Sequence, residues 1–169
     1  MKAAEAVATH AAAIDALRTP GYVAGYWATG GELPLHALLA PPPPFVYCLP
    51  CLMPDKSLRF APWRSGDALV QNRYGIPEPD VVLASTLGAA ELAVVLVPLL
   101  AFDRSGTRLG AGGGYYDRSF ASLRSAPRDR RPLLVGIGYG FQEVQHLPRA
   151  PWDVPLDLVL TEQGPVDCG

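Results

Sequence analysis

Glycines gather in residues 102–118, which have the sequence FDRSGTRLGAGGGYYDR. Gly110 and the three glycines at 112–114 follow an apolar run and precede an amphipathic stretch. Because glycine has no Cβ, such a backbone can turn tightly and approach a ligand closely. Its N–H groups, together with the start of the helix that follows, form a cradle for phosphate. The pattern predicts a phosphate site, with Arg108 and Arg118 on either side of it to bind phosphate oxygens.

Asp117 is the residue in this stretch that points to a metal. It is expected in the first turn of the helix, where a carboxylate interacts favourably with the helix dipole. A phosphate at the same end would repel it unless a cation lay between them. Mg²⁺ commonly binds one or two carboxylates together with substrate phosphates. The stretch therefore predicts a magnesium-nucleotide site with Asp117 as a metal ligand.

The glycines alone do not decide between a phosphate site and a flexible turn. No Gly-Lys-Ser/Thr follows, so the stretch is not a P-loop. Tyr115 stands where a dinucleotide-binding fingerprint has its third glycine. Asp117 also fits a role limited to the helix dipole, and Tyr115 and Tyr116 fit ordinary core packing.

The elements that must position these residues alternate between strands and helices. With 169 residues, 49% of them hydrophobic, the chain has the length of one domain and enough apolar residues for a core. We expect a single α/β domain over residues 1–169, a three-layer α/β/α sandwich with a mostly parallel, Rossmann-like sheet. Helices are expected at 3–17, 35–39 and 116–123, strands at 22–28, 45–49, 57–61, 92–97, 133–139 and 156–160, and loops at 73–80 (which contains Glu78) and 98–114.

Composition and charge exclude several classes of partner. The formal net charge is −2 and 18% of the residues are charged, which argues against binding to nucleic acid. The longest apolar run, residues 92–102, is far shorter than the about 20 residues of a membrane span. The three cysteines, including the pair in CLPC at 48–51, make neither a disulfide framework nor a zinc site. We therefore expect a reduced, cytoplasmic protein.

Five longer segments carry a more specific pattern. They are GYWATGGELPLHALL (25–39), RYGIPEPD (73–80), VLVPLLAFDRSGTRLGAGGGYYDR (95–118), VGIGYGFQEVQHLP (135–148) and WDVPLDLVLTE (152–162). In this order they resemble the 5-formyltetrahydrofolate cyclo-ligase (methenyltetrahydrofolate synthetase) family. The resemblance implies that ATP, with Mg²⁺, phosphorylates the formyl oxygen of 5-formyltetrahydrofolate. The folate N10 then attacks the activated carbon, which gives 5,10-methenyltetrahydrofolate, ADP and phosphate.

The resemblance also implies roles for single residues. The implied ATP-binding residues are Arg108, Leu109, Gly110, Ala111, Gly112, Gly113, Gly114, Tyr115 and Tyr116, and the implied magnesium ligands are Asp117 and Asp153. Trp27, Glu32 and Tyr116 are implied folate contacts, through stacking on the pterin and hydrogen bonds from its N–H groups. From the residues alone, Glu32 also fits a solvated turn, Trp27 a core position and Asp153 a turn cap.

The start of the chain departs from the family's pattern. The family begins with a longer helix that carries a Lys and then an Arg in contact with ATP phosphates, and Lys2 does not fall in that register. We therefore expect the domain at 1–169 to lack this basic helix. Two other functions stay open: a non-catalytic or weakened relative that binds folate or nucleotide, and a different nucleotide-using α/β enzyme. For the cyclo-ligase we expect a monomer whose partners are 5-formyltetrahydrofolate and ATP, with neither nucleic acid nor membrane.

Overall fold

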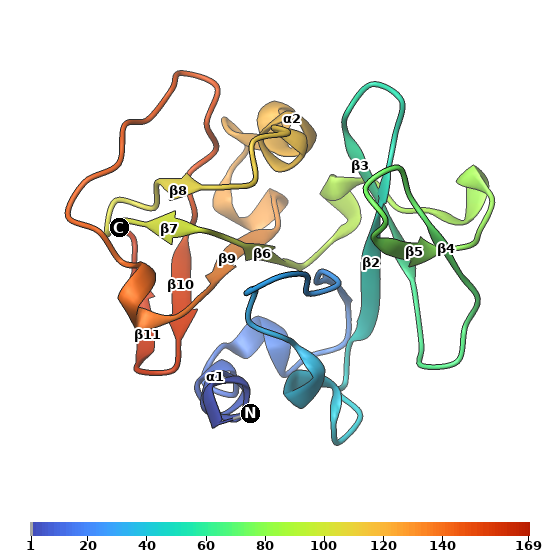
Figure 1. Cartoon of the computed structure of the whole chain (residues 1–169), viewed down its shortest axis with the longest axis horizontal. Coiled ribbons are helices and arrows are strands. Elements are labelled where there is room, and N and C mark those ends of the chain that lie inside the picture. Colours follow the sequence, from blue (N-terminus) through green and yellow to red (C-terminus); the bar gives the residue numbers. More distant parts are fainter. Residues whose placement is uncertain (1) are drawn as a thin grey trace.

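A seven-stranded sheet forms the centre of the computed structural model, which describes residues 2–169 (Figure 1). Its strands are β1 (Tyr22–Ala24), β2 (Val46–Leu52), β3 (Leu58–Pro62), β6 (Val94–Pro98), β9 (Leu133–Ile137), β10 (Leu158–Thr161) and β11 (Gly164–Asp167). They lie side by side in the order β11-β10-β9-β6-β1-β2-β3. Strands β10, β9, β6, β1 and β2 are parallel to one another, whereas β11 and β3 pair antiparallel at the two edges. The expected α/β fold with a mostly parallel sheet is confirmed.

The sheet is covered on both faces, and each face has its own apolar core. Strand β6 illustrates this, because Val94 and Leu96 belong to one core while Val95 and Val97 belong to the other. All four side chains are at most 1% exposed. Parallel strands that are buried on both faces have continuous apolar sequences. The run at 92–97 therefore marks a strand covered on both faces, as predicted, and the strand itself spans Val94–Pro98.

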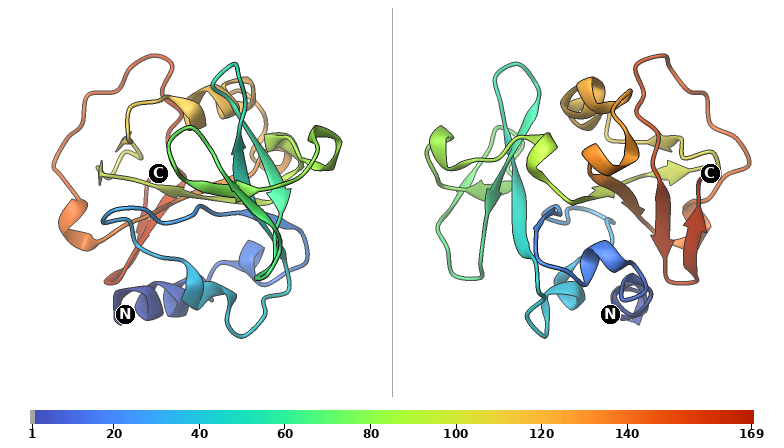
Figure 2. Two further views of the ribbon diagram at one scale, coloured as in Figure 1. Left: turned by 45° about the vertical axis from the view of Figure 1, so that its right-hand side comes forward. Right: turned by 180° about the vertical axis from the view of Figure 1, so that it is seen from behind.

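Helices cover the two faces, and they are shorter than the sequence pattern predicts. Helix α1 (Lys2–Ala11) packs on the first face and α2 (Tyr115–Phe120) on the second, on opposite sides of the sheet in Figures 1 and 2. Helix α1 ends before residue 17 because the following amides bond three residues back, as in a 3₁₀ turn. No helix in the described chain is both long and apolar enough to cross a bilayer. The remaining turns of helix are 3₁₀, at Asp15–Leu17, His36–Leu39, Leu83–Ser85, Ala89–Glu91, Ala121–Leu123, Arg128–Arg130 and Gly140–Gln142.

Strands occur in both segments expected to be loops: 98–114 contains a whole antiparallel pair, and 73–80 contains one strand of a second pair. The pairs are β4 (Leu69–Gln71) with β5 (Pro77–Pro79), and β7 (Ala101–Phe102) with β8 (Arg108–Leu109). The loop prediction for 73–80 is wrong at β5, because the prolines there occupy an edge strand, where a missing N–H does not break a sheet. Glu78 is part of this strand, and its carboxylate accepts the Leu52 amide at 3.1 Å, which ties β5 to β2.

Candidate active site

Residues 110–114 form an open loop between β8 and α2. Residues 111–114 are exposed, and the amides of 111–113 donate no hydrogen bond to any residue in the described part of the chain. Gly112 and Gly114 have φ angles of 100° and 67°, left-handed values that other residue types adopt only with strain. The loop therefore presents backbone N–H groups without protein partners, which is what a phosphate cradle requires.

Arg108 folds back over the start of α2. Its side chain is 10% exposed, and its guanidinium carbon lies 5.3 Å from the centre of the Tyr116 ring. The Tyr116 ring in turn stacks on Phe120, with ring centres 6.3 Å apart. Burial raises the pKa of the Tyr116 hydroxyl, and the neighbouring Arg108 charge lowers it in part. A cation is thus held against an aromatic ring at the mouth of the glycine loop.

A hydrogen bond ties Asp117 to the residue that follows Asp153. Asp117 Oδ1 accepts the Val154 amide at 2.9 Å, and Val154 directly follows Asp153. Asp153 Oδ2 accepts the Ala150 amide at 2.8 Å, so the turn cap considered as its alternative role is present. Each carboxylate keeps a second oxygen, and that of Asp117 lies 3.9 Å from the Arg108 guanidinium.

The chemistry of these two carboxylates fits a magnesium site that is completed by a ligand. Mg²⁺ takes oxygen ligands and is usually held by one or two carboxylates together with phosphate oxygens and water. Within residues 2–169 no group of three or more acidic, histidine or cysteine side chains is arranged to hold a metal. Asp117 and Asp153 would therefore hold the ion only in company with phosphates, and not in a cage made by the protein.

Glu32 lies in the turn after β1 and is partly buried. Thr29 donates its hydroxyl to Glu32 Oε1 at 3.0 Å, and the Glu32 amide bonds back to the Thr29 carbonyl at 3.1 Å. Partial burial raises the pKa of the Glu32 carboxyl, and the Thr29 hydrogen bonds oppose this. The Glu32 charge also raises the pKa of Tyr26 and of Tyr116, after the larger effect of burial. The negative charge of Glu32 thus acts on Tyr116, a residue of the helix that follows the glycine loop.

Two buried tyrosines hold this turn in place. Tyr26 donates its hydroxyl to the Leu33 carbonyl at 2.6 Å, and Tyr47 donates to the Tyr26 carbonyl at 3.3 Å. A Cβ at Gly25 would lie 2.2 Å from the Tyr47 hydroxyl oxygen, so glycine is needed for this contact. Trp27 lies edge-on to Trp63, with ring centres 5.8 Å apart, and is 37% exposed. It is therefore a partly exposed aromatic beside the turn and not a core residue.

A model of the 5-formyltetrahydrofolate cyclo-ligase family matches residues 1–162. The chain belongs to this family. Among curated relatives, the 5-formyltetrahydrofolate cyclo-ligase of Haemophilus influenzae is 34% identical over 164 residues, which cover 94% of this chain and 85% of the relative. The Escherichia coli K12 cyclo-ligase is 37% identical over 115 residues, 67% of this chain and 61% of the relative. The resemblance predicted from the sequence is confirmed.

Solved structures agree with the cyclo-ligase assignment. An NMR structure of Aquifex aeolicus 5,10-methenyltetrahydrofolate synthetase has 28% sequence identity and a TM-score of 0.77, and the match covers 98% of this chain and 80% of that one. A Mycoplasma pneumoniae 5,10-methenyltetrahydrofolate synthetase has a TM-score of 0.66 over 95% of this chain and 85% of that one. At 23% identity the second likeness supports the fold alone.

Arg73 is a candidate cyclo-ligase residue that the sequence reasoning missed. Its guanidinium donates to the Tyr115 hydroxyl at 2.7 Å and to the Tyr74 hydroxyl at 2.8 Å. It therefore joins the β4–β5 hairpin to the first residue of α2. RYGIPEPD resembles the family's pattern, but nothing in its spacing marks Arg73 as a partner of a tyrosine 42 residues away. Arg118, the second arginine expected beside the phosphates, lies within 4 Å of where a Cβ at Gly114 would be, and it donates to the Lys56 carbonyl at 2.9 Å.

A cavity of about 460 Å³ adjoins Asp153 on the α2 face of the sheet. Its lining includes Phe120 from α2, Arg149 and Asp153 from the segment before β10, and Leu134 from β9. The glycine loop and Glu32 do not contribute to this lining. The candidate site thus has two parts. The exposed loop and Tyr116 directly precede Asp117, and the cavity is lined in part by Asp153.

Proposed function

We propose that the protein converts 5-formyltetrahydrofolate to 5,10-methenyltetrahydrofolate with consumption of ATP, in a magnesium-dependent reaction that releases ADP and phosphate. One observation carries the proposal. On a cyclo-ligase fold, the unpaired amides of the glycine loop adjoin Arg108, whose guanidinium lies over the Tyr116 ring and 3.9 Å from the Asp117 carboxylate. A cytoplasmic, monomeric working form is part of the same proposal.

The reaction has two steps that need positioning more than covalent help from the protein. The formyl oxygen attacks the γ-phosphorus of ATP, and ADP leaves. The N10 lone pair then attacks the formyl carbon, N10 loses its proton, and phosphate leaves with the former formyl oxygen. Holding both reactants in line makes the second step intramolecular, and the first gains most from neutralised phosphate charge.

The phosphates of ATP belong at the glycine loop in this proposal. The amides of 111–113 bind phosphate oxygens, and Arg108 supplies a positive charge from its place against the Tyr116 ring. Asp117 and Asp153 hold magnesium, which when bound offsets the charge of the phosphates. Without a cation, the two carboxylates would repel a triphosphate at the same place.

The folate belongs on the Glu32 side of Tyr116. An ionised Glu32 accepts hydrogen bonds from pterin N–H groups, a pairing that apolar contacts cannot replace. Trp27 offers a partly exposed ring for stacking on the pterin. Tyr116 then lies between the two substrates, in line with its expected contact to both.

The test is product formation by the purified protein. With 5-formyltetrahydrofolate, ATP and Mg²⁺, methenyltetrahydrofolate should appear by its absorbance, and ADP and phosphate should appear in equal amounts. Omission of ATP, or chelation of the metal, should stop the reaction. Calorimetric binding of ATP or folate with no product would instead support the non-catalytic relative. Tight ATP binding with no affinity for folate would favour a different nucleotide-using enzyme.

A further inference from the structure

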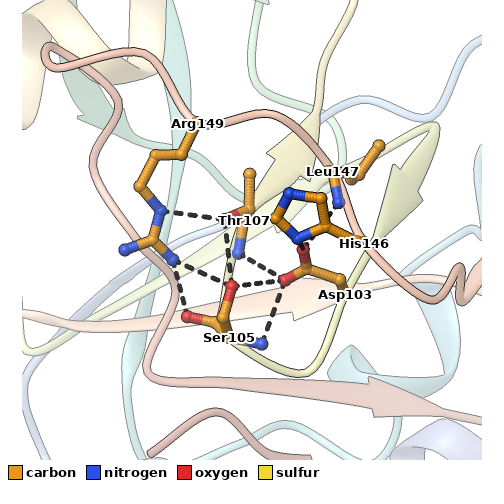
Figure 3. Close-up of polar contacts among 6 residues, drawn as sticks. All are labelled: Asp103, Ser105, Thr107, His146, Leu147 and Arg149. Atoms are coloured by element: carbon orange, nitrogen blue, oxygen red, sulfur yellow. Dashed lines mark hydrogen bonds and ion pairs between the residues drawn. The ribbon is translucent and has the colours of Figure 1, made fainter.

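Asp103 lies outside the proposed substrate contacts, yet its side chain is only 3% exposed and both of its carboxylate oxygens accept hydrogen bonds (Figure 3). Its Oδ1 accepts the Ser105 amide at 3.0 Å, the Ser105 hydroxyl at 2.6 Å and the Thr107 amide at 3.2 Å. Its Oδ2 accepts the Leu147 amide at 2.8 Å and lies 3.9 Å from the exposed His146 ring. One carboxylate thus closes the turn between β7 and β8 and joins it to a segment about 40 residues away in the chain.

The turn at 103–107 also contacts the far end of that segment. The Leu156 amide donates to the Gly106 carbonyl at 2.9 Å. A Cβ at Gly106 would lie 2.5 Å from the Leu156 carbonyl oxygen, so the two backbones touch. Leu147 and Leu156 bracket Asp153. The turn therefore bonds to the chain both before and after Asp153, the proposed metal ligand.

Arg149 adds a second connection between the same two segments. Its Nε donates to the Thr107 hydroxyl at 2.8 Å, and its Nη2 donates to the Ser105 carbonyl at 2.7 Å and the Ser105 hydroxyl at 3.2 Å. Figure 3 shows the guanidinium reaching over the turn to these oxygens. Thr107 is followed directly by Arg108, the first residue of β8. The connection therefore links the strand that leads into the glycine loop with the segment that carries Asp153.

The charge of Asp103 suits this role. Burial raises the pKa of its carboxyl, but the hydrogen bonds from Ser105, Leu147 and Thr107 outweigh burial and lower it overall. Four N–H and O–H donors aimed at one side chain require an acceptor at both oxygens. A carboxylate meets this demand and an amide cannot, because one end of an amide is itself a donor.

We propose that Asp103 is a positioning residue for the nucleotide and metal side of the reaction. It closes the turn that holds the Asp153 segment against β8, and so sets the distance between Asp153 and the phosphates bound at the glycine loop. The proposal rests on the proposed function. We call the contacts of Asp103 and Arg149 described above the Asp103 clasp. The proposal predicts that the clasp affects the binding of ATP and not the binding of folate.

The test is Asp103→Asn, which keeps the shape of the side chain but places an NH₂ group against an N–H donor. The KM for ATP, and the dissociation constant of Mg-ATP measured by calorimetry without folate, should rise about 10- to 100-fold, as for other groups that orient metal ligands. The KM for 5-formyltetrahydrofolate should stay within about twofold, since Glu32 is not held by the clasp. Hydrogen exchange of the Leu147 amide should become faster.

Two further variants control the test. Glu143→Gln removes an exposed ion pair with Arg104 that spans the same two segments, with a nitrogen–oxygen distance of 2.6 Å, and should leave both KM values unchanged. Arg149→Met removes the second connection at an exposed side chain, so the fold should persist even if Asp103→Asn does not fold. It should raise the KM for ATP in the same selective way.

The outcomes separate this inference from the proposed function. If the parent protein forms product and folded Asp103→Asn and Arg149→Met leave the KM for ATP unchanged, the positioning role is wrong. An equal rise in both KM values, in step with a lower melting temperature, also overturns it, because that is the result of a merely structural role. If the parent protein makes no product, the proposed function fails, and calorimetry with Mg-ATP still decides on the clasp.

Discussion

The turn at 103–107 and the loop at 110–114 flank the same strand, β8, and both contain glycine in a left-handed conformation. In the turn, the buried carboxylate of Asp103 binds four donors, and Gly106 touches the backbone of Leu156. In the loop, the amides of 111–113 have no partner in the described chain, and nothing lies within 4 Å of where a Cβ at Gly112 would be. Gly106 permits close packing against Leu156, whereas the space around Gly112 is open to a ligand.

The difference indicates that the two regions at the ends of β8 have separate roles. A ligand-binding loop needs donors that the protein has not already used, and a closely packed neighbour that fixes where those donors lie. The turn at 103–107 is the closely packed neighbour, and the loop at 110–114 has the unused N–H donors. The predictions below change one of the two regions at a time, so that stability and substrate binding can be separated.

The largest effect is expected for Gly106→Ala. The added methyl would lie 2.5 Å from a backbone oxygen at a φ of 87°, so both a clash and backbone strain oppose folding. The free energy of unfolding should fall by about 3 kcal/mol or more, measured by urea denaturation. Gly112→Ala is the matched control, with a φ of 100° and open space around it. It should lose only about 1 kcal/mol, and equal losses in the two variants would remove the distinction between turn and loop.

Asp117→Asn tests the loop side. The amide oxygen can still accept the Val154 N–H, so the melting temperature should stay close to that of the parent. The loss of a negative ligand should reduce magnesium-dependent product formation about 100-fold. Titration of activity with Mg²⁺ should show a higher requirement. Unchanged activity and metal requirement would show that Asp117 does not bind the metal.

Glu32→Gln tests whether the two substrates are recognised separately. An amide cannot accept as a carboxylate does, so the KM for 5-formyltetrahydrofolate should rise about tenfold, while the KM for ATP stays unchanged. In the parent, burial raises the pKa of Glu32, so folate binding should weaken as the pH falls through that raised value. The glutamine variant should lack this acid limb in the pH profile. A profile shared by both proteins would contradict the role of Glu32.

The same raised pKa has a consequence for stability. A carboxyl whose pKa is higher in the folded state binds more protons when folded, so its stabilising contribution is complete below the unfolded pKa. That contribution is lost as the pH rises through the folded pKa. Glu32→Gln should therefore gain stability relative to the parent at neutral pH. Chemical denaturation at acid and neutral pH measures this, and a loss of stability at neutral pH would contradict it.

The smallest effect is expected for Arg73→Leu. The contacts of Arg73 with Tyr74 and Tyr115 are exposed, and exposed polar contacts contribute less than about 1 kcal/mol. The KM for ATP should rise about two- to fivefold, because Tyr115 loses a partner at the start of α2. The control is Arg64→Leu, at an exposed position of another loop, which should have no effect. A large loss of stability in Arg73→Leu would mean that the hairpin contact supports the fold.

Much of the fold could be predicted from periodicity and from the apolar runs. The strand at 92–97 and the parallel sheet follow from continuous burial, which any compact α/β arrangement must provide. The pattern was less informative for α1, for β11 and for the proline-rich edge at β5. The positions of helix ends and edge strands depend on which backbone groups find hydrogen-bond partners. The local sequence does not specify those partners.

The sequence by itself determined the family, through five ordered segments, and the kinds of chemistry that the site residues offer. Only the tertiary structure decided that Val154 bonds to Asp117, that Glu32 and Arg108 both act on Tyr116, and that Asp103 holds the segment of Asp153. The physical reason is that residue type sets what a side chain can donate or accept. Its partner depends on which distant segments the packed sheet brings within about 3 Å, and spacing along the chain does not contain that information.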